Sequence, residues 1–276
     1  MHLRAVIEYM SFQKSLFFIR EYLFPFGCGG CGRALLSPHD TLYGLCGDCR
    51  KLFLSMEMSR CEICGKPLIS ERDTCLSCRE KGSAGNGAYS ETLVKLRTLF
   101  PYTGKFRSIL GAYKFSKSLG IGNFLCTCLG AVLAGFELEL SVPGINGDAA
   151  WVPVPPRPGK IRKQGWDQID YLAKLLENEY KSFRCHIPGN DNKTDKIRPL
   201  PVRRCLKRLR SRSQKELNRE ERGTNLKGRI LCIREPPRTA LLFDDVFTTG
   251  ATLNACAAAL LEGGAEKVYG VCLFYD

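Results

Sequence analysis

The chain has 276 residues, of which 44% are apolar, 10% aromatic and 25% charged. These proportions are those of a folded globular protein, and they exclude disordered and fibrous classes. The 41 Lys and Arg residues against 28 Asp and Glu residues give a formal net charge of +13, which favours an anionic partner such as a nucleic acid, a phosphate-rich ligand or an acidic membrane surface.

The N-terminal segment lacks the pattern of an export signal. Charged residues interrupt it, and its longest apolar run, Leu16–Ile19, is too short for a signal-peptide core. The apolar stretch at 124–136 is shorter than the roughly 20 residues of a spanning helix, so it predicts a buried core helix. We therefore expect no membrane span and a cytoplasmic, reducing location, in which a disulfide framework is the less expected use of the cysteines.

Eight of the 15 cysteines lie between positions 28 and 78, in four Cys-x-x-Cys pairs. Two intervening residues let a tight turn direct both thiolates at one ion, and two such pairs complete a tetrahedral zinc site. Glycine follows the first and third pairs but not the second and fourth. This alternation predicts two successive ribbons, each with one structural Zn²⁺; a cross-braced pairing of first with third and second with fourth is the alternative. The predicted ligands are Cys28, Cys31, Cys46 and Cys49 for one ion, and Cys61, Cys64, Cys75 and Cys78 for the other.

A stretch rich in Gly and Ser predicts a linker at 81–88. It separates an N-terminal helix and double zinc ribbon at 1–80 from a larger domain at 89–276. Within the larger domain, 157–165 carries four basic and no acidic residues, and 203–229 carries eleven basic against three acidic residues. Charge this concentrated indicates an anion site rather than an evenly solvated surface.

The C-terminal half alternates short apolar strands with helices. The predicted strands are 149–155, 239–246 and 267–275, and the predicted helices are 166–180 and 252–261. This alternation predicts an α/β fold in which helices cover both faces of a parallel sheet. Ligands bind such sheets at the carboxyl ends of the strands, where Asp244 and Asp245 fall.

A threonine-rich loop follows the two aspartates and leads into a helix. Its small residues leave backbone N–H groups open, and the helix dipole favours an anion there. The carboxylates suit the hydroxyls of a sugar, so a ribose-phosphate would satisfy both parts of the motif. The chain contains no G-x-x-x-x-G-K-[ST] sequence, so a P-loop nucleotidase is not supported. The loop consists of Thr248, Thr249, Gly250, Ala251 and Thr252.

The stretch LLFDDVFTTGATL resembles the signature with which type I phosphoribosyltransferases bind phosphoribosyl pyrophosphate (PRPP). The order of motifs over roughly residues 20–276 is similar to that of the ComF family of competence-linked, phosphoribosyltransferase-like proteins. Those motifs are, in chain order, the four cysteine pairs, YTG at 102–104, YKF at 113–115, VPVP at 152–155, RKQGWDQ at 162–168, SQKELNREERGTNLKG at 213–228 and the PRPP loop. The resemblance implies a type I phosphoribosyltransferase-like α/β domain preceded by a small zinc-ribbon domain.

The resemblance also implies roles for individual residues. Asp244 and Asp245 would hold the ribose hydroxyls of PRPP, with Mg²⁺ nearby, and the loop from Thr248 to Thr252 would bind the 5′-phosphate. The loop that carries Arg157 and Lys160 falls where type I enzymes hold pyrophosphate, so both join the aspartates as candidate catalytic residues. Further candidate cations are Arg162, Arg212, Arg219 and Arg222, whereas no general base is apparent.

The family resemblance implies a protein that binds PRPP with Mg²⁺ and assists single-stranded DNA handling in natural transformation. Its expected partners are PRPP, single-stranded DNA and DNA-uptake proteins. Two alternatives stay open: a metabolic phosphoribosyltransferase that moves ribose-5-phosphate from PRPP to a nucleobase-like acceptor, and a non-catalytic PRPP sensor. The sequence does not decide whether PRPP is turned over.

Overall fold

The computed structural model describes residues 26–54, 59–63, 65–66, 68, 73–76, 78–79, 92–140, 148–182, 199–210 and 228–276. The chain divides into two compact units, 1–56 with 104–124 and 57–103 with 125–276. These units are divided differently from the predicted domains, because the second group of cysteines belongs to the same unit as the sheet and 104–124 belongs with the first group. The predicted linker at 81–88 lies outside the described residues.

The first unit combines the first four cysteines with short helices. Ser37 caps α2, since its hydroxyl accepts a hydrogen bond from the N–H of Asp40 at 3.0 Å, and Gly44 ends this helix with a positive φ of 62°. Phe53 makes edge-to-face contacts with Phe106 and Phe124, each with ring centroids 4.9 Å apart. These contacts give the unit its own small core. Its helices are α2 (Pro38–Tyr43), α3 (Gly47–Leu54), α5 (Gly104–Phe115) and the start of α6 (Leu119–Leu140).

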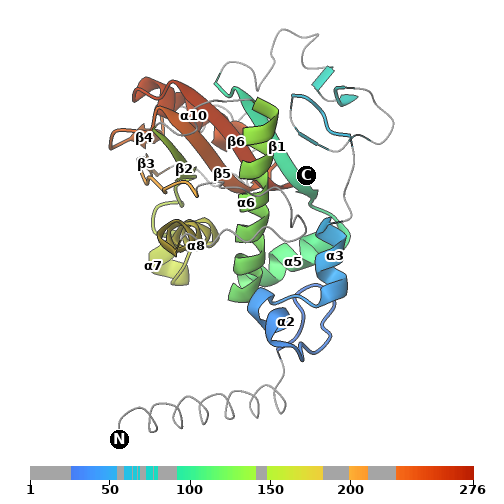
Figure 1. The fold of residues 1–276 in the computed structure, drawn as a ribbon. Helices are drawn as coiled ribbons and strands as arrows, with labels where there is room; N and C mark the ends of the chain where they lie inside the picture. The colour runs from blue at the N-terminus through green and yellow to red at the C-terminus, as the bar shows by residue number, and fades with distance from the viewer. Residues whose placement is uncertain are drawn as a thin grey trace, which may run out of the picture. The chain divides into compact units, whose positions relative to one another are not determined.

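The second unit contains a four-stranded parallel sheet in the order β1-β6-β5-β2 (Figure 1). The α/β fold class is therefore confirmed. The strands at 149–155, 239–246 and 267–275 are present within two residues of their predicted ends, whereas β1 was not predicted. The strands are β1 (Lys95–Pro101), β2 (Ala149–Pro153), β5 (Thr239–Phe247) and β6 (Lys267–Tyr275), and the helices are α7 (Lys160–Gln164), α8 (Gln168–Ser182) and α10 (Ala251–Glu262).

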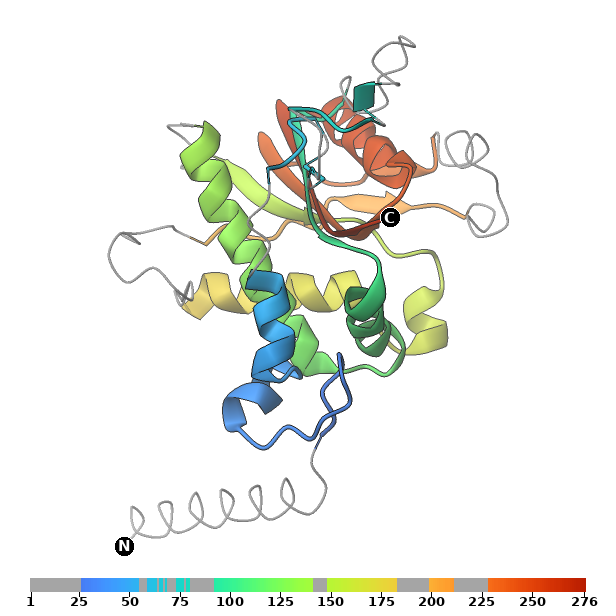
Figure 2. The ribbon, with the colours of Figure 1, turned by 90° about the vertical axis from the view of Figure 1, so that its right-hand side faces the viewer.

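Helices cover both faces of this sheet, as the alternating pattern predicts (Figure 2). Ala240 and Leu242 of β5 lie in one buried cluster with apolar residues of α10. On the opposite face Phe243 packs edge-to-face against Trp151, with ring centroids 5.8 Å apart, and α8 contacts β2 and β5. Alternate residues of the strand thus point to two apolar layers, which explains why its sequence is apolar almost throughout.

An additional segment runs along the outer side of β2. Val202 forms a parallel bridge with Trp151, whose N–H donates to the carbonyl of Pro201 at 2.9 Å. The segment then enters β3 (Leu206–Arg208), which pairs antiparallel with β4 (Ile230–Cys232). Because 201–203 runs parallel to β2, residues 206–210 emerge at the same end of the sheet as the loop that follows β2.

The outer side of β1 is covered by residues that precede it in the chain. Nη1 of Arg60 donates to the carbonyls of Gly65 at 3.0 Å and Thr98 at 2.7 Å. Gly65 has a φ of +67°, and a Cβ there would come within 2.9 Å of the backbone of β1. This close approach, together with the left-handed conformation, requires glycine.

We expect Arg60→Gln to lower the free energy of unfolding of the second unit by about 1–3 kcal/mol, because the backbone carbonyls of Gly65, Thr98 and Leu99 lose a charged donor. The measurement is urea unfolding followed by tryptophan fluorescence. The matched control is Arg229→Gln, since Arg229 is exposed and its change should leave stability within about 0.5 kcal/mol of the wild type. Equal stability of the two variants would contradict a role for Arg60 in fixing this segment to β1.

The apolar stretch at 124–136 lies within α6, as expected for a core helix. Leu125, Leu129 and Leu133 recur at helical spacing and are buried. Within the described ranges, no single helix combines the length and apolar composition needed to cross a bilayer, although α5 and α6 together reach it by length and composition with a 119° bend between them.

Candidate functional site

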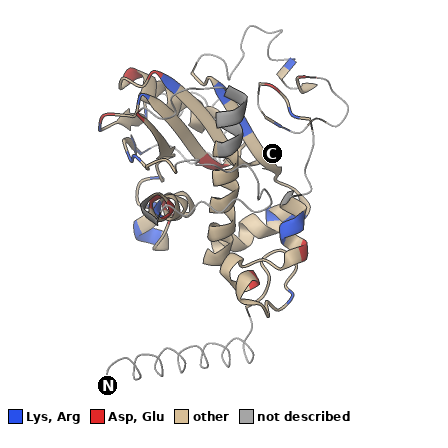
Figure 3. Ribbon diagram, in the orientation of Figure 1, with Lys and Arg blue, Asp and Glu red and all other residues tan. Residues whose placement is uncertain are grey.

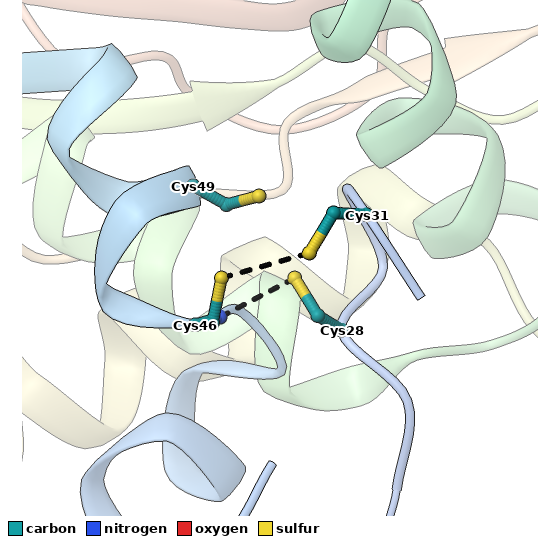
Figure 4. A group of neighbouring side chains, drawn as sticks. All are labelled: Cys28, Cys31, Cys46 and Cys49. Carbon is teal, nitrogen blue, oxygen red and sulfur yellow. Dashed lines mark hydrogen bonds between the residues drawn. The ribbon is translucent and has the colours of Figure 1, made fainter. Parts of the chain in front are cut away.

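The first four cysteines converge on one point (Figure 4). The Sγ atoms of Cys28, Cys31, Cys46 and Cys49 all lie within 4.8 Å of one another. Those of Cys31 and Cys46 are 3.7 Å apart, close to the ~3.8 Å expected between two thiolates of a tetrahedral site with Zn–S bonds of about 2.3 Å. The residues therefore fit a closed, four-sulfur zinc site with no open position for a substrate.

The second group repeats the local geometry of the first. In each group the N–H of the first cysteine donates to a carbonyl five residues on, at 2.8 Å, in Cys28 to Arg33 and in Cys61 to Lys66. Gly32 has a positive φ of 75°, matching Gly65 in the second group. The Sγ atoms of Cys61, Cys75 and Cys78 lie within 4.8 Å of one another, and Cys64 lies outside the described residues. The described cysteines thus follow the sequential arrangement rather than the cross-braced one.

The Cys28 thiol is held in a state that suits metal binding. Burial raises its pKa, but hydrogen bonds from backbone N–H groups, led by that of Cys46, outweigh this effect and bring the pKa to about 7, from an ordinary value of 9.0. The N–H of Cys46 donates to Sγ of Cys28 at 3.3 Å. Because zinc binds the thiolate, these donors favour the ligand form.

A second site forms where β5 ends. Asp245 is only 7% exposed, and its carboxylate accepts a hydrogen bond from Nε2 of Gln168, at the start of α8. Asp244 lies beside it, and its Oδ1 accepts the backbone N–H of Asp245 at 2.8 Å. The predicted acidic pair is thus held in position by the strand and by one neighbouring helix.

The threonine loop lies directly against this pair. Gly250, with a φ of +78°, turns the chain into α10, and its carbonyl accepts from Asn254 at 2.9 Å. Oγ1 of Thr249 accepts the N–H of Ala251 at 3.4 Å. A small hollow of about 20 Å³ is lined by Asp244 together with residues 246–253. The structure therefore brings together one aspartate and all five predicted loop residues.

A wider cleft lies at the loop that follows β2. It has a volume of about 1180 Å³ and is lined by 155–159, 161–163, 206–208 and 210. Among the described residues this lining includes six basic side chains and no acidic one; the basic residues are Arg157, Arg162, Lys163, Lys207, Arg208 and Arg210. Figure 3 shows the basic residues of α7 and β3 in blue. The first basic segment and the described part of the second thus meet across one cleft.

Comparison with known proteins agrees with this arrangement. A family model described as a double zinc ribbon domain matches residues 19–79. Competence protein ComFC of Streptococcus pneumoniae is 27% identical over 81% of this chain and 84% of its own length. Competence protein F of Haemophilus influenzae is 25% identical over 89% and 95%, and DNA utilization protein YhgH of Escherichia coli is 25% identical over 84% and 97%. Over most of its length the chain is similar to these relatives of the ComF family.

Lys160 does not line the basic cleft. Its Nζ contacts Oδ2 of Asp167 at 2.6 Å and also donates to Oε1 of Gln168. Asp167 is 4% exposed, and its Oδ1 accepts the first N–H groups of α8. The ammonium group of Lys160 thus neutralises the buried carboxylate of Asp167 and is linked through Gln168 to Asp245. These contacts indicate that Lys160 helps to position the side chains next to the acidic pair.

The described basic residues near these sites are of two kinds, those in ion pairs and those that line the cleft. Arg203 bonds to Asp148, and Arg204 bonds to Asp170 and Glu177, so both act in structural ion pairs. Arg212, Arg219 and Arg222 lie outside the described residues. No sequence pattern predicted an individual role for four residues that link or line the sites, namely Asp167, Gln168, Lys163 and Arg208. The motif at 162–168 contained the first three, but no signal assigned their contacts.

Proposed function

We propose that this chain is a member of the ComF family that binds PRPP with Mg²⁺ at the carboxyl end of β5 and assists the handling of single-stranded DNA during DNA uptake. The proposal rests on three features that lie at the same end of the sheet. These are the acidic pair, the threonine loop at the start of α10, and a cleft lined by basic residues from two segments. A sugar that carries phosphates on two positions complements this combination.

The residues present suit each part of PRPP. Carboxylates such as Asp244 and Asp245 accept hydrogen bonds from ribose hydroxyls, and they supply the oxygen ligands that Mg²⁺ prefers. The N–H groups at the start of α10 face the position of a 5′-phosphate in this proposal. Mg²⁺, when bound, would neutralise charge on the pyrophosphate group. Arg157 would contribute further positive charge from the cleft.

The DNA part of the proposal rests on relatives and on charge. The relatives in S. pneumoniae and H. influenzae are named competence proteins, and that in E. coli is named a DNA utilization protein. A single strand carries one negative charge per phosphate, so a cleft lined by six basic side chains supplies the electrostatic part of binding.

Neutralising the exposed cations of the cleft should weaken binding of single-stranded DNA and flatten its salt dependence. The variant replaces four cleft residues by Gln, namely Arg162, Lys163, Lys207 and Arg210. If all four contact phosphates, the magnitude of the slope of log binding constant against log salt concentration should fall by up to about 2.8. Fluorescence anisotropy with a labelled oligonucleotide at several salt concentrations gives the slope. The control replaces four exposed basic residues outside the cleft lining, namely Lys174, Arg234, Arg238 and Lys267. Equal slopes for both variants would contradict a DNA role for the cleft.

The intact acidic pair and loop also favour a second candidate, a metabolic phosphoribosyltransferase. Pyrophosphate release from Mg²⁺-PRPP distinguishes the two, with single-stranded DNA and then a panel of nucleobases offered as acceptors. Release that requires one nucleobase would assign the metabolic reaction. Binding of PRPP and DNA without nucleobase-dependent release would support the DNA-handling role.

A further inference from the structure

Arg208 is a buried basic residue in an unusual setting. It lies on β3, where Leu206 and Arg208 point inward and Lys207 between them is exposed. Strand alternation therefore places Arg208 where an apolar residue is expected. Its side chain is only 8% exposed, yet it lines the basic cleft.

Two nitrogen atoms of this guanidinium have no hydrogen-bond partner among the described residues. Among the residues that the structure describes, neither Nε nor Nη2 of Arg208 has a hydrogen-bond acceptor, although both atoms are buried. Nε and Nη2 form one edge of the guanidinium, the edge that meets two oxygens of a carboxylate or a phosphoryl group at once. A buried donor pair without acceptors is unfavourable unless a ligand supplies them.

The surrounding charges indicate the sign and size of that ligand. Burial lowers the pKa of Arg208, and the positive charge of Arg157 lowers it further, while Asp244 acts in the opposite direction. Two cations that both line the cleft thus lie within electrostatic reach of each other. A multiply charged anion compensates both of them, which the single charge of one phosphodiester does not.

We propose that Arg208, together with Arg157, binds the terminal phosphoryl groups of a diphosphate ligand through the Nε–Nη2 edge of its guanidinium. The proposal deepens the proposed function and rests on it only for the natural source of the diphosphate, which would be PRPP. It adds a residue and a binding geometry that the sequence motifs did not assign.

The test uses inorganic pyrophosphate and the full-length, zinc-loaded protein. Arg208→Met removes the unpaired charge while keeping side-chain length, so the melting temperature without ligand should stay equal or rise. The affinity for pyrophosphate should fall roughly 10- to 100-fold, as for loss of a bidentate charged contact. Lys174→Met is the control, because Lys174 is exposed and lies outside the cleft lining, so it should keep wild-type affinity for pyrophosphate. Arg208→Lys, which keeps the charge but not the two-pronged edge, should also lose affinity.

The outcomes separate this inference from the proposed function. Wild-type affinity for pyrophosphate in both Arg208 variants would overturn the inference, and so would a wild-type protein that binds no pyrophosphate. Loss of pyrophosphate binding in the Arg208 variants, with no PRPP binding by the wild type, would support the inference and contradict the PRPP proposal. An equal loss of single-stranded DNA affinity in Arg208→Met would assign the site to phosphodiesters and overturn the diphosphate ligand.

Discussion

Replacing Cys46 by serine should lower the zinc content from two ions per chain to one and unfold the first cysteine ribbon. Cys46 is buried, and its Sγ belongs to a closed cluster of four. A structural zinc ion contributes about 10–16 kcal/mol of binding free energy in small zinc-finger peptides, so losing one ligand removes the main stabilising contact of a short segment. Metal analysis by mass spectrometry gives the zinc content, and limited proteolysis reports unfolding of residues 26–54.

Two controls sharpen this measurement. Cys232→Ser changes a cysteine outside both clusters and should retain two ions. Cys75→Ser should also lose one ion, but its damage should extend to the parallel sheet, because Cys75 lies in the same buried cluster as Leu93 and Leu96. If the Cys46 variant kept two zinc ions and resisted protease, the sequential four-cysteine site would be wrong.

The double variant Asp244→Asn, Asp245→Asn should lower the affinity for Mg²⁺-PRPP by about 100-fold or more, since two charged acceptors are lost together. The amide oxygen at 245 can still accept the hydrogen bond from Gln168, so the fold should be preserved. Isothermal titration calorimetry gives the affinity, and circular dichroism checks the fold.

A matched control for the aspartate variant is available on the adjoining helix. Glu262→Gln removes one exposed negative charge at the end of α10 and should leave PRPP affinity unchanged. Unchanged PRPP affinity in the double aspartate variant would contradict a PRPP site at the end of β5. That result would still leave the basic cleft as a separate site for DNA.

Elements with strong local patterns were predictable from the sequence. The apolar run before the aspartates gave the strand that became β5, and the alanine-rich segment before two glycines gave α10 within one residue. The Cys-x-x-Cys spacing likewise predicted the cysteine groups, because two cysteines must be separated by two residues for a tight turn to direct both thiolates at one ion. These predictions depend on contacts between residues close in the chain.

Features that depend on distant contacts were not predictable. β1 carries Lys95 and Arg97 among its apolar residues, so its sequence resembles an exposed segment until it pairs with β6. The resemblance implied that the loop with Arg157 and Lys160 falls at the pyrophosphate, but it gave no sign of the contact between Lys160 and Asp167, which forms only when α7 and the start of α8 fold together. Arg208 was one basic residue in a long basic stretch, and three residues of strand are too short to show which of them point inward.

Both outer strands of the parallel sheet are covered, one by 201–203 along β2 and the other by the second cysteine ribbon along β1. Uncovered strand edges are templates on which other chains pair and aggregate. The second ribbon therefore covers a strand edge that would otherwise be open to pairing. We expect a shortened protein that starts at residue 89, which keeps every predicted PRPP residue but exposes β1, to self-associate.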